Sequence, residues 1–142
     1  MAVSRIQVTL PCELNKVWEA VTSLTVYGWR SDLSKIEVLS DTRFVEYTKD
    51  GYATTFTTTA LEPYQRWEFD LENGNITGHW IGLFAEMDGH TQLELTETIT
   101  AKKFFMRPFV KAYLKKQQAR YIADLKRALE MERGNANGTQ ES

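Results

Sequence analysis

Apolar and polar positions alternate through residues 43–100, and three dipeptides suited to tight turns divide this stretch into four extended segments. The dipeptides are Asp50-Gly51, Asn73-Gly74 and Asp88-Gly89. Asn-Gly and Asp-Gly pairs favour type I′ hairpin turns, because they tolerate the positive φ angles that both central positions require. The pattern therefore predicts an antiparallel meander in the middle of the chain.

Two-residue turns would fix which side chains share a face of this sheet. With such turns, and a short turn at Pro63-Tyr64, one face is mostly apolar. The predicted cross-strand pairs are Tyr47 with Thr54, Val45 with Phe56, Trp67 with Trp80, Phe69 with Gly78, Trp80 with Glu97 and Phe84 with Leu93, and Thr58 and Ala60 share their face. The opposite, polar face carries Glu46, Arg66, Glu68, Asp70, Glu94, Thr96 and Thr98. An apolar face of this size needs a cover.

Helical segments flank the predicted meander. Residues 4–10 alternate as a first strand that Pro11 ends, and apolar side chains at helical spacing then predict a short helix over 13–24. Residues 25–33 are expected to form a short helical or irregular crossing before a strand near 35–39.

A long amphipathic helix is predicted from about residue 104 to 131 and would cover the apolar face. Its apolar stripe consists of Met106, Val110, Tyr113, Leu114, Gln117, Tyr121, Leu125 and Ala128. Residues 134–142 have no apolar periodicity. We therefore expect a single domain over 1–133, followed by a disordered tail over 134–142.

Length, charge and cysteine content narrow the class of protein. The 142 residues suit one domain, and 17 basic against 19 acidic residues argue against a dedicated nucleic-acid binder. Cys12 is the only cysteine and cannot form an internal disulfide, which favours a reducing compartment. The chain begins with a strand pattern rather than a leader, and no segment approaches the ~20 apolar residues of a membrane span. We expect a cytoplasmic protein without an integral membrane segment.

Four features carry a resemblance to a known family: RIQVTLPCELNKVWEAV followed by Trp29, the Gly78 and Trp80 pair, TQLELTETIT, and YIADLKRALE. In these features and their order the chain resembles the START/Bet v 1-like (SRPBCC) superfamily over about residues 4–131, and in particular its polyketide cyclase/dehydrase-like bacterial members. The resemblance implies an α+β helix-grip fold, in which a curved antiparallel sheet of about six or seven strands wraps around a long C-terminal helix, with short helices after the first strand. Superfamily members bind lipids, sterols, polyketides or other hydrophobic molecules, and some catalyse cyclisation or dehydration.

Small residues such as Gly78 and Gly82 beside large aromatic ones predict, together with the resemblance, a cavity between sheet and helix. The alternative is that helix side chains fill this space and the aromatic residues are plain core. The candidate cavity residues are Trp29, Tyr47, Phe56, Trp67, Trp80, Phe84, Glu97, Tyr113, Gln117 and Tyr121.

Glu97 interrupts the inward series Leu93, Leu95 and Ile99, where alternation calls for an apolar side chain. A buried carboxyl group is costly unless it is paired or protonated. Glu97 is therefore a candidate to hydrogen-bond a ligand hydroxyl, or to act as an acid or base with a raised pKa. The alternative is a structural carboxylate that meets a partner near the end of the sheet.

Other polar residues are weaker candidates for a functional role. His79 is predicted on the polar face as a solvated side chain, and with His90 it has no spacing that suggests a metal site, so we expect no metal and no cofactor. A basic patch consists of Lys102, Lys103, Arg107, Lys111, Lys115, Lys116 and Arg120. The simplest interpretation of this patch is a solvated face; an anionic ligand, a membrane surface or an acidic partner are the alternatives.

The sequence thus predicts a protein that binds or carries a small hydrophobic ligand of lipid, polyketide or aromatic type. One alternative is a polyketide cyclase/dehydratase-like enzyme that uses Glu97 or a cavity tyrosine as acid or base. Another is a co-chaperone-like interaction module, which would have a filled interior. Enzymatic activity and a homodimer are left open by the sequence.

Overall fold

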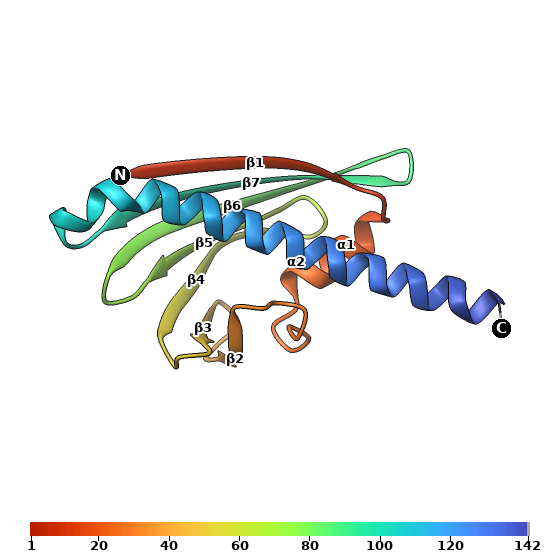
Figure 1. Cartoon of the computed structure of the whole chain (residues 1–142), viewed down its shortest axis with the longest axis horizontal. Helices are drawn as coiled ribbons and strands as arrows, with labels where there is room; N and C mark the ends of the chain where they lie inside the picture. Colours follow the sequence, from red (N-terminus) through yellow and green to blue (C-terminus); the bar gives the residue numbers. More distant parts are fainter. Residues whose placement is uncertain (142) are drawn as a thin grey trace.

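The computed structural model describes residues 1–141 of the chain, and the side chains of residues 1–130. Seven strands form one antiparallel sheet in the order β1-β7-β6-β5-β4-β3-β2. The long helix α2 runs across one face of this sheet, and the short helix α1 contacts α2 (Figure 1). The elements are β1 (Ala2–Leu10), α1 (Leu14–Thr22), β2 (Leu33–Val38), β3 (Arg43–Thr48), β4 (Ala53–Glu62), β5 (Arg66–Glu72), β6 (Ile76–Met87), β7 (His90–Ala101), η1 (Phe104–Met106) and α2 (Arg107–Glu141).

This architecture confirms the predicted α+β helix-grip fold. In the described chain a single short helix, α1, follows β1, rather than several. Residues 23–32 form turns and bends. Ser23 Oγ accepts hydrogen bonds from the backbone N–H groups of Thr25 and Val26, and this local turn competes with continuation of the helix. The resulting loop leads from α1 to the edge strand β2.

The β6–β7 hairpin has the predicted register. Asp88 and Gly89 adopt φ angles of 50° and 80°, as a type I′ turn requires. Trp80 consequently pairs with Glu97.

The β5–β6 hairpin has a longer loop than predicted. Glu72 pairs with Thr77, so four residues rather than two separate the paired positions, and within them Asn73 Oδ1 accepts a hydrogen bond of 3.0 Å from the backbone N–H of Ile76. Trp67 therefore pairs with Gly82 rather than with Trp80. Because this is a shift of two positions, every side chain returns to the predicted face.

The β3–β4 hairpin contradicts a predicted face. The Thr48 N–H bonds to the Tyr52 carbonyl, so the loop has one residue more than the predicted turn. Tyr47 pairs with Ala53, and a shift of one residue exchanges the two faces of β3. Glu46, predicted on the polar face, consequently lies on the helix side, and Tyr47, predicted to face inward, lies on the opposite face.

The turn between β4 and β5 also differs from the prediction. Glu62 pairs with Arg66, so one more residue than predicted forms the connection. A bulge between Thr58 and Ala60 compensates for this extra residue further along β4. As a result Phe56 keeps its predicted inward face, whereas Ala60 moves to the outer one.

Two polar contacts fix the position of α2, one to β1 of the sheet and one to the 23–32 loop. Ser4 Oγ donates to Gln118 Oε1 at 2.8 Å, and Gln118 Nε2 donates to the Ser4 carbonyl at 2.9 Å. Asp124 Oδ2 accepts hydrogen bonds from the Ser31 backbone N–H and Oγ at 2.8 and 2.7 Å. Since buried polar groups need partners, sliding of α2 would leave all four residues unsatisfied.

Two further predictions concern the C-terminal tail and membrane spans. The disordered tail predicted over 134–142 lies outside the residues whose side chains the structure describes, and it remains a prediction. In the described part of the chain, no helix combines the length and apolar character needed to cross a membrane.

Gly78 and Gly82 allow close packing rather than leaving empty space. A Cβ atom on Gly82 would lie 2.6 Å from the Trp80 ring, and one on Gly78 would lie 2.6 Å from the backbone oxygen of Thr98. The interpretation of these glycines as cavity space was therefore wrong.

We expect Gly78→Ala to lower the free energy of unfolding by about 1–3 kcal/mol, because the backbone of β7 must move to admit the methyl group. Gly28→Ala is the matched control, since its Cβ would meet no atom within 4 Å. It should change the free energy of unfolding by no more than about 0.5 kcal/mol. Urea unfolding of the two variants measures the difference, and equal values would contradict the packing role of Gly78.

Candidate functional site

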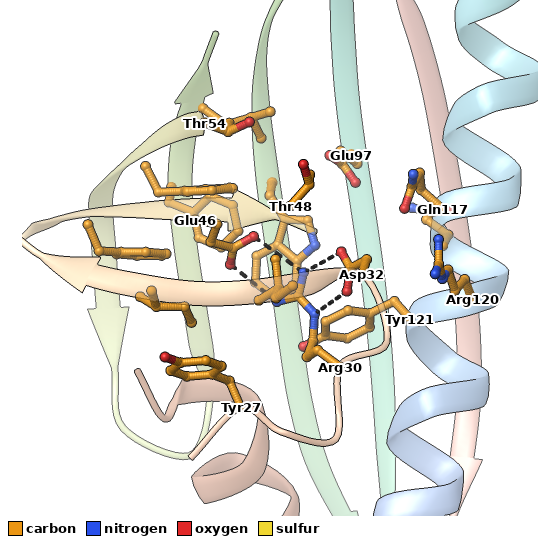
Figure 2. A pocket seen from close by; sticks show the side chains of 18 of the residues that line it. Tyr27, Arg30, Asp32, Glu46, Thr48, Thr54, Glu97, Gln117, Arg120 and Tyr121 are labelled. Atoms are coloured by element: carbon orange, nitrogen blue, oxygen red, sulfur yellow. Dashed lines mark hydrogen bonds and ion pairs between the residues drawn. The ribbon is translucent and has the colours of Figure 1, made fainter. Parts of the chain in front are cut away.

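A cavity of about 490 Å³ lies between the sheet and α2 (Figure 2). Eight of the ten predicted cavity residues line it: Trp29, Phe56, Trp67, Trp80, Glu97, Tyr113, Gln117 and Tyr121. The side chains of α2 thus cover the apolar face of the sheet without filling the space above it.

Aromatic side chains from β3–β6 form one wall of the cavity. The rings of Phe44 and Phe56 stack with centroids 4.9 Å apart, and those of Phe69 and Trp80 stack at 4.6 Å. Trp67 packs edge-on against both Phe69 and Trp80, at 5.0 and 5.6 Å. Each strand presents every second side chain to this side, so alternation brings these rings together on one surface. The wall offers a planar apolar molecule a large contact area.

Tyr47 and Phe84 do not line the cavity. The Tyr47 hydroxyl donates to Glu37 at 3.1 Å on the outer face, as the register of β3 dictates. Phe84 faces inward but packs edge-on against Trp18 of α1, with ring centroids 4.8 Å apart. Helix α1 therefore fills the space at the end of β6, where the sequence analysis had predicted part of the cavity.

A charged cluster centred on Arg30 lines the cavity next to the aromatic wall (Figure 2). Its guanidinium donates to Asp32 at 3.2 and 3.0 Å and to Glu46 at 3.2 and 3.3 Å, so both contacts are bidentate. The Tyr121 ring centroid lies 5.2 Å from the guanidinium carbon, and that of Trp29 lies 6.0 Å away. Burial opposes the charge, but Glu46 and Asp32 outweigh it and raise the pKa of Arg30. The positive charge of Arg30 is thus matched by two carboxylates.

Sequence reasoning missed most of this cluster. Arg30 and Asp32 lie in the irregular 23–32 loop, where no periodicity shows which way a side chain points. Their spacing of two residues was the available signal, because it permits a local ion pair. Glu46 was assigned to the wrong face of the sheet because the β3–β4 loop has one residue more than the predicted turn.

The loop that carries Arg30 is tied to α2 through Ser31. Besides the bonds from Ser31 to Asp124, Arg120 Nε donates to Ser31 Oγ at 2.9 Å, and Arg127 pairs with Asp124 at 2.7 Å. Burial alone would raise the pKa of Asp124, but the hydrogen bonds from Ser31 and the nearby arginines lower it. An ionised Asp124 therefore holds the loop, and Arg30 with it, against the helix.

Glu97 projects from β7 into the cavity (Figure 2). Burial raises its pKa to about 7, the neighbouring charge of Glu46 adds to the rise, and Arg30 only partly offsets it. Among the described residues, none forms a hydrogen bond or ion pair with its carboxyl group. Glu97 is thus a group poised between its neutral and ionised forms near neutral pH, with its hydrogen-bonding capacity unused.

The remaining polar groups lie on the α2 side. Tyr121 packs edge-on against Trp29, with centroids 5.4 Å apart, and burial raises the pKa of its hydroxyl. Gln117 faces the cavity, and Tyr113 lines it while remaining 54% exposed, which places Tyr113 at an opening. The Trp29 indole N–H is buried and has no hydrogen-bond partner in the described part of the chain.

His79 lies on the outer face of the sheet, as predicted, but it is not simply solvated. Its ring nitrogens lie 2.9 Å from Glu68 and 2.7 Å from Asp70. Burial lowers the pKa of His79, but hydrogen bonds to the two carboxylates outweigh this and raise it. This group is separated from the cavity by the sheet.

Solved structures share this fold. A START superfamily protein from Mycobacterium smegmatis superposes with a TM-score of 0.80 at 12% identity, covering 92% of this chain and 99% of that chain. A conserved protein from Geobacillus kaustophilus gives 0.79 at 11% identity, with 91% and 95% covered. The di-domain ARO/CYC BexL from the BE-7585A biosynthetic pathway gives 0.75 at 12% identity, with 92% of this chain and 47% of that chain covered. At such identities the likeness is one of fold.

Sequence comparison gives a family. No curated protein is found to match the chain. The family described as "Polyketide cyclase / dehydrase and lipid transport" matches residues 1–130. Since this match includes every strand and most of α2, the chain belongs to the polyketide cyclase/dehydrase and lipid transport family.

Proposed function

We propose that this protein binds a small, largely apolar molecule in the cavity between the sheet and α2, and that the molecule carries a hydrogen-bond donor. The observation that carries the proposal is the unpartnered carboxyl group of Glu97 facing a cavity with an aromatic wall. Glu97 is half-buried, and a carboxyl group that is partly removed from water without a protein partner is costly, so a ligand donor would stabilise it.

The size of the cavity suits a compact ligand. Small-molecule sites commonly enclose roughly 300–1,000 Å³, and 490 Å³ lies within this range. The stacked pairs Phe44–Phe56 and Phe69–Trp80 favour flat rings over a flexible chain, because aromatic groups pack well against one another.

The charges in the cavity favour a hydroxyl or amino group over a carboxylate. Arg30, which could have received an anion, already meets Asp32 and Glu46. A ligand carboxylate near Glu97 would add to the negative charge, which is costly in a buried site. A hydroxylated molecule of aromatic or polyketide type combines an apolar body with such a donor, whereas a fatty acid brings a carboxylate.

A second candidate is an enzyme of the polyketide cyclase or dehydratase type. The pKa of about 7 for Glu97 favours it, because a group that titrates near neutral pH can both accept and release a proton. The co-chaperone-like alternative would have a filled interior, and the cavity argues against it.

Ligand binding can be tested with a variant that fills the cavity. Gln117 lines the cavity and Ala119, two residues along α2, is exposed. We expect Gln117→Trp to weaken binding by about tenfold or more, equivalent to about 1.4 kcal/mol, and Ala119→Trp to leave the affinity within about twofold. Calorimetric titration with a hydroxylated flavonoid, a sterol and a fatty acid gives the affinities. Failure of all three to bind, or equal effects of both substitutions, would count against the proposal.

Glu97 should make stability depend on pH. Because its folded pKa is raised to about 7, the unfolded chain loses this proton first as pH rises, and the folded state loses stability between about pH 4.5 and 7. From pH 5 to pH 8 the wild type should lose on the order of 2 kcal/mol relative to Glu97→Gln. Urea unfolding at both pH values measures this, with the exposed Glu86→Gln as control. Parallel pH profiles of wild type and Glu97→Gln would show that Glu97 titrates as an ordinary carboxyl group.

The enzyme candidate makes a separate prediction. If Glu97 transfers a proton, Glu97→Gln should abolish turnover of an aromatic polyketide substrate while the substrate still binds, because the amide keeps a similar shape but cannot act as acid or base. Single-turnover analysis by mass spectrometry, paired with a binding titration, distinguishes the two effects. Unchanged turnover in Glu97→Gln would exclude this role for Glu97.

A further inference from the structure

The segment that joins β7 to α2 exposes a concentration of large apolar side chains. Residues 102–109 are all exposed, and four of them are apolar: Phe104 at 77%, Phe105 at 57%, Met106 at 43% and Phe109 at 67%. We call these four side chains the tip patch. η1 and the first turns of α2 form one end of the molecule, on the same side as the N-terminus (Figure 1).

The described part of the chain provides no cover for the tip patch. The rings of Phe104 and Phe105 contact each other, with centroids 6.1 Å apart, but neither belongs to the hydrophobic core. Val110 is the first α2 side chain that is buried. A cluster of exposed aromatic side chains that no other part of the fold covers indicates an interaction surface.

The charge around the tip patch indicates which kind of partner this surface binds. Between residues 101 and 123 the chain has seven basic and no acidic residues, although its net charge is -2. The basic residues are Lys102, Lys103, Arg107, Lys111, Lys115, Lys116 and Arg120. Among the described side chains, Lys102 is the one member of this set within ion-pair distance of a carboxylate, at 3.2 Å from Glu72. Lys103, Arg107 and Lys111, which adjoin the tip patch in sequence, thus add positive charge beside it, with no carboxylate within ion-pair distance among the described side chains.

We infer that the tip patch and its basic rim dock this protein on an anionic lipid bilayer. Aromatic side chains partition into the boundary between headgroups and acyl chains, and lysines and arginines around them are attracted to anionic headgroups. A second copy of the chain fits less well, because symmetric pairing of the same patch would bring the basic rims against each other. The proposal does not depend on which small molecule the cavity holds.

The position of the cavity opening agrees with this docking mode. Tyr113 follows Phe109 by about one helical turn, is 54% exposed, and also lines the cavity. The basic and aromatic surface therefore extends along α2 from the tip to the opening. A protein docked in this way would present its cavity opening close to the lipid surface.

The test is co-flotation of the full chain with vesicles of phosphatidylcholine, with and without phosphatidylserine. We expect binding to the anionic vesicles that weakens with salt. The double variant Phe104→Ser with Phe109→Ser should reduce partitioning about tenfold or more, because it removes two inserted rings. Lys103→Glu with Lys111→Glu should abolish the preference for phosphatidylserine. Leu61→Ser and Lys126→Glu are matched controls, since both residues are exposed but lie outside the patch. All the substituted positions are exposed, and circular dichroism checks folding.

The inference is overturned if the wild type does not bind anionic vesicles, or if the control variants weaken binding as much as the tip variants do. It is also overturned if light scattering shows a dimer that Phe104→Ser with Phe109→Ser dissociates, since the patch would then contact a second copy. The tip variants should leave calorimetric binding of cavity ligands unchanged, so failure of this inference and failure of the proposed function are separate results.

Discussion

The polar half of the cavity depends on one desolvated ion cluster. Arg30 reaches two carboxylates through bidentate contacts, one from its own loop and one from β3. Removing one partner from such a buried group typically costs about 3–5 kcal/mol, so the loop, β3 and α2 constrain one another. Ser31 completes this arrangement by joining the loop to Asp124. The cluster fixes an irregular segment that has no secondary structure of its own.

The same cluster sets the electrostatics of the cavity. The charge of Arg30 is matched within the cluster, so it lowers the pKa of Glu97 only in part, and burial together with Glu46 raises that pKa to about 7. One wall of the cavity is therefore aromatic and the other is polar without being cationic. Alternate residues of each strand face the helix, so the sheet supplies the aromatic rings together with Glu46 and Glu97, while loop 23–32 adds Arg30 and Asp32.

The order of elements, the fold and most of the cavity could be predicted from the sequence, because alternation and helical spacing record which side chains are buried. The Asp88-Gly89 turn was predicted correctly because a type I′ turn requires two positive φ angles, and Asp88 and Gly89 adopt them. The Asp50-Gly51 turn was not, because a third residue joins the loop and dipeptide identity does not determine loop length. Phe84 was misplaced because alternation gives the face of a strand but not which element packs against it. Arg30 and Asp32 lie where no periodicity exists.

The loop between β3 and β4 has one residue more than a two-residue turn, and its length decides which face of β3 points toward the cavity. Loss of one residue there would rotate β3 by half a pleat repeat, withdrawing Glu46 from the interior and bringing the phenol of Tyr47 in. Arg30 would then lose one of its two carboxylates and could receive an anion. A single-codon deletion at this turn is therefore a short mutational route that exchanges which β3 side chain, Glu46 or Tyr47, faces the cavity.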